Sequence, residues 1–263
     1  MGDDLDAVNL GTNRTAVAIA GARNHNCALL NDGTVKCWGY NYYGQLGQGH
    51  TDSIGRAADD MGDNLTAIDL GTNKTAVAID AGDSHTCAVL NDGTVKCWGY
   101  GSNGRLGNGS TSSSKTPVVV SGITTAQQVS ASHTHSCAVL SDKTVKCWGR
   151  NNLKQLGDGT TTDRSTPVTV SGVTNASMVS LGREYNQEFT CALLENGTVK
   201  CWGRKSTGLL GDGTASSQVS PVSVSGLSSA SQGNAFNHTC VVEGGAVKCW
   251  GDNNNGQLGD GTT

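Results

Sequence analysis

The stretch "CALLNDGTVKCWG", residues 27–39, decides the fold, because four close copies of it follow along the chain. They read "CAVLNDGTVKCWG" from Cys87, "CAVLSDKTVKCWG" from Cys137, "CALLENGTVKCWG" from Cys191 and "CVVEGGAVKCWG" from Cys240. Together the five copies contain all 10 cysteines and all 5 tryptophans. A motif that recurs along a whole chain marks a tandem-repeat architecture.

Within one copy, the sequence predicts a β-hairpin. Asn31 and Asp32 favour a type I turn, and Gly33 can adopt the positive φ of a bulge that closes a three-residue loop. Counting outward from this loop places Cys27 opposite Cys37 in a non-hydrogen-bonded pair. The two backbones come closest in such a pair, so a cross-strand disulfide can fit.

The fifth copy is one residue shorter and supports the same pairing. Gly244 and Gly245 suit a two-residue primed turn, which again places its two cysteines opposite each other. Each bridge closes a short loop and is worth roughly 2–3 kcal/mol in the chain-entropy account. The predicted disulfides are Cys27–Cys37, Cys87–Cys97, Cys137–Cys147, Cys191–Cys201 and Cys240–Cys249.

Two alternatives for the cysteines are buried, reduced thiol pairs and a zinc site. Structural zinc sites usually gather four ligands with cysteines two to four residues apart, whereas each copy offers two thiols and one histidine. The disulfide interpretation is favoured. Disulfides persist in oxidising compartments, so we expect an extracellular or cell-surface protein.

The composition fits short strands joined by many turns. Hydrophobic residues make up 36% of the 263 residues, aromatic residues 5%, and there are 37 glycines. The formal charge of −4 argues against a nucleic-acid-binding surface. No apolar run is long enough for a membrane span, and the first residues lack the basic start and apolar stretch of a signal peptide.

Five equal units leave no room for a second domain, so we expect a single repeat array over residues 1–263. The first twenty residues align without a gap on residues 61–80, which is typical of a piece cut from a longer precursor. The expected repeats span about residues 1–60, 61–120, 121–170, 171–224 and 225–263.

Each repeat reads as four short strands, and four-stranded units arranged around an axis form a β-propeller. We therefore predict an all-β propeller of five four-stranded blades, or part of a larger propeller. The chain ends just before the last outer strand is due, and residues 5–11 match that missing strand. This strand would close the ring within one molecule, or build a filament if it entered the next molecule.

Residues 85–109, "HTCAVLNDGTVKCWGYGSNGRLGNG", resemble the regulator of chromosome condensation repeat family. The shared pattern is a histidine before the hairpin, then CWG, then a glycine-rich loop ending in LGxG. The resemblance implies a propeller, in most members seven-bladed, that binds proteins through the loops of its faces. Members include exchange factors for the small GTPase Ran, ultraviolet-B receptors, ubiquitin-ligase modules and secreted β-lactamase inhibitors. The GWRHT motif of the photoreceptors is absent from this sequence.

Two recurring residue types are candidates for a structural role or for chemistry. A histidine stands two residues before the first cysteine in four copies, and Phe189 replaces it in the fourth. Four such histidines could line the axis and bind a metal, but the resemblance implies that each orders its own blade. We expect the tryptophans to pack between blades. These residues are His25, His85, His135 and His238, with Trp38, Trp98, Trp148, Trp202 and Trp250.

Two insertions interrupt the repeats. Residues 50–64 carry Asp59, Asp60 and Asp63, which could bind calcium, but the spacing of an EF-hand is missing and a solvated loop is favoured. We therefore expect no metal and no cofactor. The second insertion, "LGREYNQEF", mixes aromatic, arginine and amide side chains, a composition typical of interaction surfaces. The candidate binding loop is Arg183, Glu184, Tyr185, Asn186 and Gln187.

No arrangement of catalytic residues emerges, because there is no nucleophile elbow or phosphate-binding loop and the cysteines are paired. We expect a non-catalytic extracellular scaffold that binds a protein partner. The alternatives are a filament subunit that exchanges its terminal strand, and a secreted enzyme inhibitor or lectin-like binder. Possible glycosylation sites are Asn13, Asn64, Asn73, Asn108, Asn175, Asn196 and Asn237.

Overall fold

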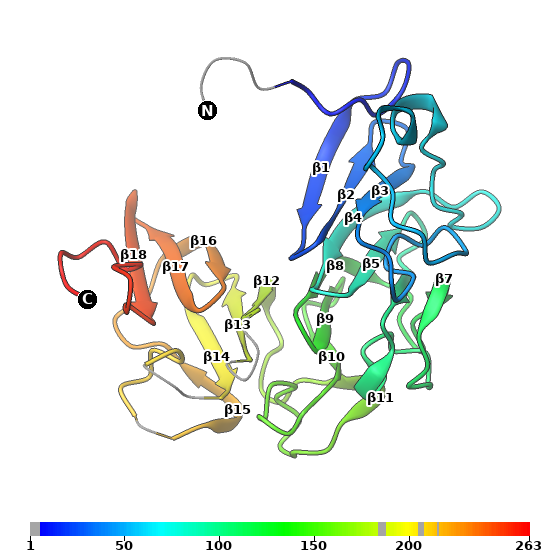
Figure 1. Cartoon of the computed structure of the whole chain (residues 1–263). Coiled ribbons are helices and arrows are strands. Elements are labelled where there is room, and N and C mark those ends of the chain that lie inside the picture. The colour runs from blue at the N-terminus through cyan, green and yellow to red at the C-terminus, as the bar shows by residue number, and fades with distance from the viewer. Residues whose placement is uncertain (1–5, 184–187, 205–207, 215) are drawn as a thin grey trace.

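The chain is an all-β propeller of five blades that follow one another along an arc (Figure 1). The computed structural model describes residues 6–183, 188–204, 208–214 and 216–263. Among these residues, no helix is long and apolar enough to cross a membrane.

Each blade is one antiparallel sheet whose strands run from the axis outward in chain order. Blade one contains β1 (Ala16–Gly21), β2 (His25–Leu30) and β3 (Val35–Gly39). Blade two contains β4 (Ala76–Ala81), β5 (His85–Leu90), β6 (Val95–Gly99) and β7 (Ser114–Val119). Blade three contains β8 (Ala126–Ala131), β9 (His135–Leu140), β10 (Val145–Gly149) and β11 (Arg164–Thr169). Blade four contains β12 (Ala176–Leu181), β13 (Phe189–Leu194), β14 (Val199–Gly203) and β15 (Gln218–Ser223), and blade five contains β16 (Ala230–Ala235), β17 (His238–Glu243) and β18 (Ala246–Gly251).

The hairpin register is the one expected from the turns. Leu30 and Thr34 close the three-residue loop of the first blade, and Gly33 has φ 77°. In the fifth blade Gly244 and Gly245 both have positive φ, as a two-residue primed turn requires. In the third blade Lys143 holds the left-handed position, with φ 65°, that glycine holds in its neighbours.

The five disulfides are confirmed. In every blade the two cysteines face each other across the hairpin, with Cα atoms 4.0–4.1 Å apart. That short separation is typical of a non-hydrogen-bonded antiparallel pair. No cysteine is free, so all ten are committed to structure.

The hydrophobic core is divided into four clusters, one at each junction between consecutive blades. At the junction of blades two and three, for example, the buried Cys87–Cys97 bridge and Val95 of one blade pack with Val129 and Trp148 of the next. The disulfide therefore lies in the apolar layer between blades. Because each cluster joins only neighbouring blades, stability is built up junction by junction, as in other repeat proteins.

Two blades depart from the four-stranded pattern, since the first and the last have three strands each. In blade one only Ile54 pairs with Gly39, and the chain then turns through two 3-10 helices, Ala58–Asp60 and Gly62–Asn64. The insertion between residues 50 and 64 thus stands where the outer strand of this blade was expected.

The N-terminal segment lies on the first blade and not on the last, which corrects the expectation for residues 5–11. The described residues 6–15 contain no strand. The Asp63 carboxylate accepts hydrogen bonds from the backbone and the hydroxyl of Thr12, at 2.8 and 2.7 Å. The Lys36 ammonium donates to the carbonyls of Leu10 and Gly62, both at 2.8 Å. These bonds hold the segment on its own blade; its exchange between molecules stays an untested prediction.

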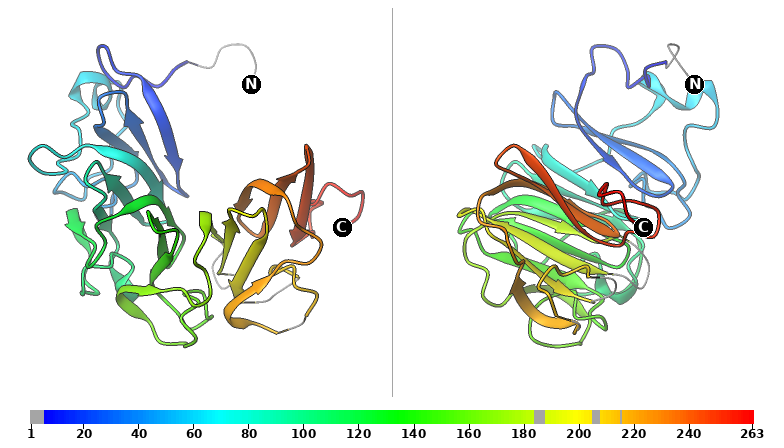
Figure 2. Two further views of the ribbon diagram at one scale, coloured as in Figure 1. Left: turned by 180° about the vertical axis from the view of Figure 1, so that it is seen from behind. Right: turned by 90° about the vertical axis from the view of Figure 1, so that its left-hand side faces the viewer.

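The first and last blades lie at the two ends of the arc, and no pairing joins them among the described strands (Figure 2). Each inner strand instead contacts the inner strand of the next blade, from β1 through β4, β8 and β12 to β16. The strands of each blade fall inside one of the five repeats expected from the sequence.

Candidate protein-binding face

Two sets of loops share one face of the propeller. In each blade the loop between the first two strands and the loop after the Trp-Gly pair leave the same end of the sheet, because the strands are antiparallel. A backbone bond ties the two loops together, as when the Tyr40 N–H donates to the Asn24 carbonyl at 2.8 Å. We call this end of the molecule the loop face.

Four tyrosines form a cluster on the loop face of the first two blades. Tyr40 and Tyr42 are stacked with ring centroids 6.3 Å apart, and Tyr42 meets Tyr43 edge-on at 5.0 Å. Tyr43 reaches across to Tyr100 of blade two at 4.3 Å. Tyr40 and Tyr42 remain 41% and 65% exposed. The cluster therefore presents two tyrosine rings to solvent on a support of packed rings.

Arg105 supports this cluster from the second blade. Its guanidinium lies 4.6 Å from the Tyr100 ring centroid, a cation–π contact, and only 3% of the residue is exposed. It also donates to the carbonyls of Ser102 and His133, which joins blades two and three. Burial lowers the pKa of Arg105 to about 10, so the group is still charged at neutral pH.

The repeat-four insertion is anchored at both of its described ends, whereas Glu184, Tyr185, Asn186 and Gln187 lie outside the described residues. Arg183 donates to the Gly21 carbonyl of blade one at 2.9 Å and to the Asp80 carboxylate of blade two at 2.8 Å. Its side chain thus reaches from the fourth blade to the first two. Asp80 also accepts from Ser130 and the Ala131 N–H of blade three.

Glu188, at the other end of the insertion, is a buried carboxylate on the loop face. It accepts hydrogen bonds from the Thr134 hydroxyl at 2.7 Å and the Gln155 amide at 3.3 Å. Burial raises the pKa of Glu188, while Thr134, Arg150 and Arg105 act in the opposite direction. His133 lies nearby, with its Nδ1 at 2.7 Å from the Asp83 carboxylate.

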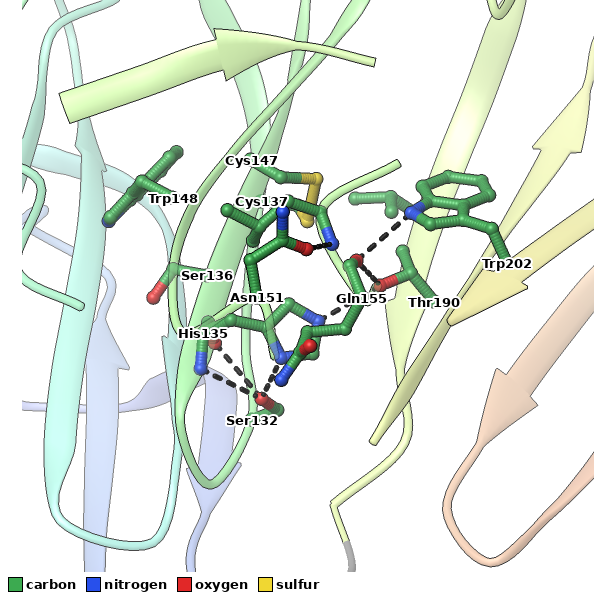
Figure 3. Close-up of a disulfide and its surroundings, with 12 residues drawn as sticks. Ser132, His135, Ser136, Cys137, Cys147, Trp148, Asn151, Gln155, Thr190 and Trp202 are labelled. Carbon is green, nitrogen blue, oxygen red and sulfur yellow. Dashed lines mark hydrogen bonds between the residues drawn. A yellow bond between two sulfur atoms is a disulfide. The ribbon is translucent and has the colours of Figure 1, made fainter. Parts of the chain in front are cut away.

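The histidines before the hairpins link neighbouring blades. His135 Nε2 lies 2.9 Å from the Thr190 hydroxyl of the next blade (Figure 3). That hydroxyl donates to the Gln155 carbonyl at 2.8 Å, and the Trp202 indole donates to the same carbonyl at 3.0 Å. One carbonyl of the third blade thus holds two donors of the fourth. His25 with Thr86 and His85 with Ser136 repeat the arrangement at the two earlier junctions.

This network fixes the tautomer of the three histidines. A hydroxyl has a single O–H, and here it donates to the carbonyl. The ring Nε2 must therefore carry a hydrogen and donate it to the hydroxyl oxygen. Burial lowers the pKa of His25 to about 4, that of His135 to about 3, and that of His85 well below its usual value. All three rings are therefore neutral donors at neutral pH, in keeping with a structural role.

The fourth junction lacks a histidine, since Phe189 holds its place and is fully buried. Trp250 still donates to the Leu209 carbonyl at 3.1 Å. His238, in the last blade, is half-buried, as are Trp250 and Trp38. Trp98, Trp148 and Trp202 are fully buried between blades.

The aspartates of the insertion at residues 50–64 form hydrogen bonds with nearby backbone groups. The Asp60 carboxylate accepts from the N–H groups of Gly55, Arg56 and Ala57. Asp63 binds Thr12, and Asp59 offers its carbonyl to Asn64. Within the described ranges, no three His, Cys, Asp or Glu side chains are grouped so that they could hold a metal ion.

The asparagines of the seven sequons are distributed over the surface, and glycosylation stays a prediction. Asn13, Asn64, Asn73 and Asn196 are exposed, and Asn108, Asn175 and Asn237 are half-buried.

The tyrosine cluster was not foreseen from the sequence, although a signal for it was present. Four of the 5 tyrosines fall in the segments "YNYYG" and "YG" directly after the first two Trp-Gly pairs. The Thr or Ser directly before the first cysteine of the second, third and fourth copies was a second signal, because these hydroxyls form the links between blades.

Comparison with known families places repeats along most of the chain. Two profiles, both described as "Regulator of chromosome condensation (RCC1) repeat", match. One covers residues 92–139 and 144–187, and the other covers residues 15–45, 76–105, 126–155 and 185–208.

Curated relatives share part of this chain. Human E3 ubiquitin-protein ligase HERC2 is 34% identical over 104 residues, which is 40% of this chain and 2% of that protein. Ultraviolet-B receptor UVR8 of Arabidopsis thaliana is 30% identical over 106 residues, 40% of this chain and 22% of that protein. The match thus spans only a minor part of each relative.

Solved propellers show the same fold over nearly all of this chain. Human WBSCR16 superimposes with a TM-score of 0.79 at 22% identity, covering 95% of this chain and 65% of that one. Prp20p from Saccharomyces cerevisiae superimposes with a TM-score of 0.77 at 18% identity, covering 95% and 61%. Prp20p itself has binding properties toward Gsp1p and histones.

Proposed function

Because the chain belongs to the regulator of chromosome condensation repeat family, we propose that it is a non-catalytic scaffold that binds a protein partner outside the cell. The observation that carries the proposal is the tyrosine cluster on the loop face. Tyrosines supply large, rigid contact area and a polar tip, and they are enriched at the centres of protein interfaces. Tyr40 and Tyr42 are both exposed, so a partner could bury the surface that their rings leave in solvent.

The rigidity of the site supports this function. Tyr43 packs against both the exposed Tyr42 ring and the Tyr100 ring, and the buried Arg105 guanidinium contacts Tyr100. A preorganised surface loses less side-chain entropy on binding than a mobile one, so more of the contact energy appears as affinity.

The extracellular setting is supported by the five disulfides. A direct check is to express the chain in an oxidising and in a reducing compartment and to titrate free thiols in the two products. Protein that folds cooperatively with all thiols free would contradict this part of the proposal.

Binding at the loop face is tested with a matched pair of variants, Tyr42→Ala and Val119→Ala. Both remove an exposed apolar side chain, but Val119 belongs to the outer strand β7 and lies outside the tyrosine cluster. Immobilised protein would be exposed to secreted proteins, and each retained protein purified and measured against both variants. We expect Tyr42→Ala to weaken binding and Val119→Ala to leave it unchanged. A partner equally sensitive to both changes, or to neither, would show that this face is not the binding site.

A further inference from the structure

The inner strands β4, β8, β12 and β16 line a cavity at the axis of the propeller (Figure 1). Its volume is about 240 Å³, which suits a small ligand or a single side chain. The wall contains Ala78 and Val129 together with Asp80 and Arg183, whose carboxylate and guanidinium lie 2.8 Å apart. Because these two charges compensate each other, the cavity favours a neutral ligand.

The hydrogen-bonding pattern of the hairpin decides which backbone groups of β8 face this cavity. Cys137 and Cys147 form a non-hydrogen-bonded pair, so the N–H and C=O of Cys137 point toward β8. Those of the next residue, Ala138, point the other way, toward β10. Ala138 lies opposite Val129. The N–H and C=O of Val129 therefore point away from β9, toward the axis.

One blade further on, the corresponding backbone groups hold a carboxamide. Val179 has the same place in β12 that Val129 has in β8, since it lies opposite Ala192 of the neighbouring strand. The Val179 N–H donates to Gln128 Oε1 at 2.8 Å, and the Val179 carbonyl accepts from Gln128 Nε2 at 3.0 Å. One side-chain amide of blade three thus satisfies both groups of blade four.

At the preceding junction, Ala78 holds the position that Gln128 holds in blade three. Alanine has no polar group that could reach Val129. Among the residues that the structure describes, no side chain or neighbouring strand bonds the inward N–H and C=O of Val129. The cavity therefore presents one donor and one acceptor, arranged as the pair that binds the Gln128 amide.

We propose that the axial cavity binds a neutral ligand through a primary carboxamide, which lies beside Ala78 and bonds both inward groups of Val129. The carboxamide oxygen accepts from the Val129 N–H, and the carboxamide N–H donates to the Val129 carbonyl. A carboxylate fits less well, because it has no donor for that carbonyl and would also meet the charge of Asp80. The inference goes beyond the proposed protein binding and does not depend on the tyrosine cluster, because the cavity is lined by the inner strands and Arg183.

Acetamide is the probe, because it is the part of a glutamine side chain beyond Cβ. It is titrated into the complete chain carrying isotope-labelled valine nitrogen, and the amide resonance of Val129 is followed by NMR. The resonance is assigned from its loss in Val129→Ile. We expect a saturable shift with acetamide, and none with acetate or with N,N-dimethylacetamide, which lacks an N–H.

Two variants test the position of the ligand. Ala78→Gln supplies the carboxamide from the chain itself and should abolish the acetamide-dependent shift of Val129. Gln128→Ala opens a second space of the same kind at Val179, so acetamide should raise the melting temperature of this variant more than that of the unmodified chain. Val119→Ala, on the outer strand β7, is the matched control and should respond like the unmodified chain.

A free small amide and a glutamine side chain of a partner are distinguished by a further titration. The peptide acetyl-Gly-Gln-Gly methylamide carries its only primary carboxamide on the side chain, and it is compared with propionamide. Tighter binding of the peptide would identify a partner segment, and tighter binding of propionamide a small molecule. An unshifted Val129 resonance, or equal shifts with acetamide and N,N-dimethylacetamide, would overturn the inference and leave the loop-face proposal unaffected.

Discussion

Replacing Thr86 by valine should destabilise the junction between blades one and two while keeping its shape. The Thr86 hydroxyl accepts from His25 Nε2 at 2.9 Å and donates to the Gln45 carbonyl at 2.9 Å. The Gln45 carbonyl keeps a second donor, the Trp98 indole, at 2.9 Å. His25 Nε2, by contrast, has no other partner among the described residues.

The size of the effect follows from this asymmetry. Losing the bond to Gln45 costs about 1 kcal/mol, since the carbonyl stays satisfied, whereas orphaning the buried His25 donor costs about 1–3 kcal/mol. We expect a decrease in the free energy of unfolding of about 2–4 kcal/mol, measured by urea unfolding of the oxidised protein.

The chain supplies its own control in Thr239. This residue corresponds to Thr86 at the fourth junction, where Phe189 stands in place of the histidine. Thr239 is buried, and among the described residues its hydroxyl has one contact, with the Cys191 sulfur at 4.0 Å. Thr239→Val should therefore cost less than about 1 kcal/mol. In a His25→Phe background, the cost of Thr86→Val should likewise fall to about 1 kcal/mol, since no donor is orphaned. Equal costs for Thr86→Val and Thr239→Val would refute the reasoning.

Three further results are expected. Replacing Cys137 and Cys147 together by alanine should lower stability by about 2–3 kcal/mol in urea unfolding, and an unchanged midpoint would contradict a structural bridge. Lys143→Gly should raise stability by about 0.5–1 kcal/mol, because glycine takes the positive φ of this turn without strain. Because burial lowers the pKa of His25 from 6.5 to about 4, and that of His135 to about 3, their neutral rings favour the folded state fully above pH 6.5. Stability should be lost as the pH falls from 6.5 to about 4, by on the order of 3 kcal/mol for His25 alone, because the unfolded chain binds a proton there that the buried ring does not. His25→Phe should remove that share from the pH dependence of the urea midpoint.

The hairpins and their disulfides were predictable because they depend on neighbouring residues. The turn at Asn31–Gly33 fixes the register, and the register alone puts Cys27 opposite Cys37. The shorter turn at Gly244 and Gly245 preserves the same opposition. Local chemistry of this kind can be read from spacing.

Features that depend on contacts between distant segments could not be read in this way. Residues 5–11 match a missing strand in pattern, yet Lys36 binds the Leu10 carbonyl and Asp63 binds the adjacent Thr12 on the first blade, and no pattern shows that competition. The tyrosine cluster needs Tyr43 and Tyr100 to meet across a blade junction, which requires the rotation between blades. The reach of Arg183 to Asp80, across 103 positions, is set by the curvature of the arc.

The junctions between blades also bear on how such a chain is inherited. A single repeat carries an accepting carbonyl and a histidine on one side, and a hydroxyl and a tryptophan on the other. Each repeat thus encodes both halves of its own interface. If the DNA of one repeat is duplicated in tandem, the new copy meets its neighbours at surfaces that already match, with no compensating substitution. The exchange of histidine for Phe189 affects one junction only, so a gene of this kind can vary in length and in sequence one blade at a time.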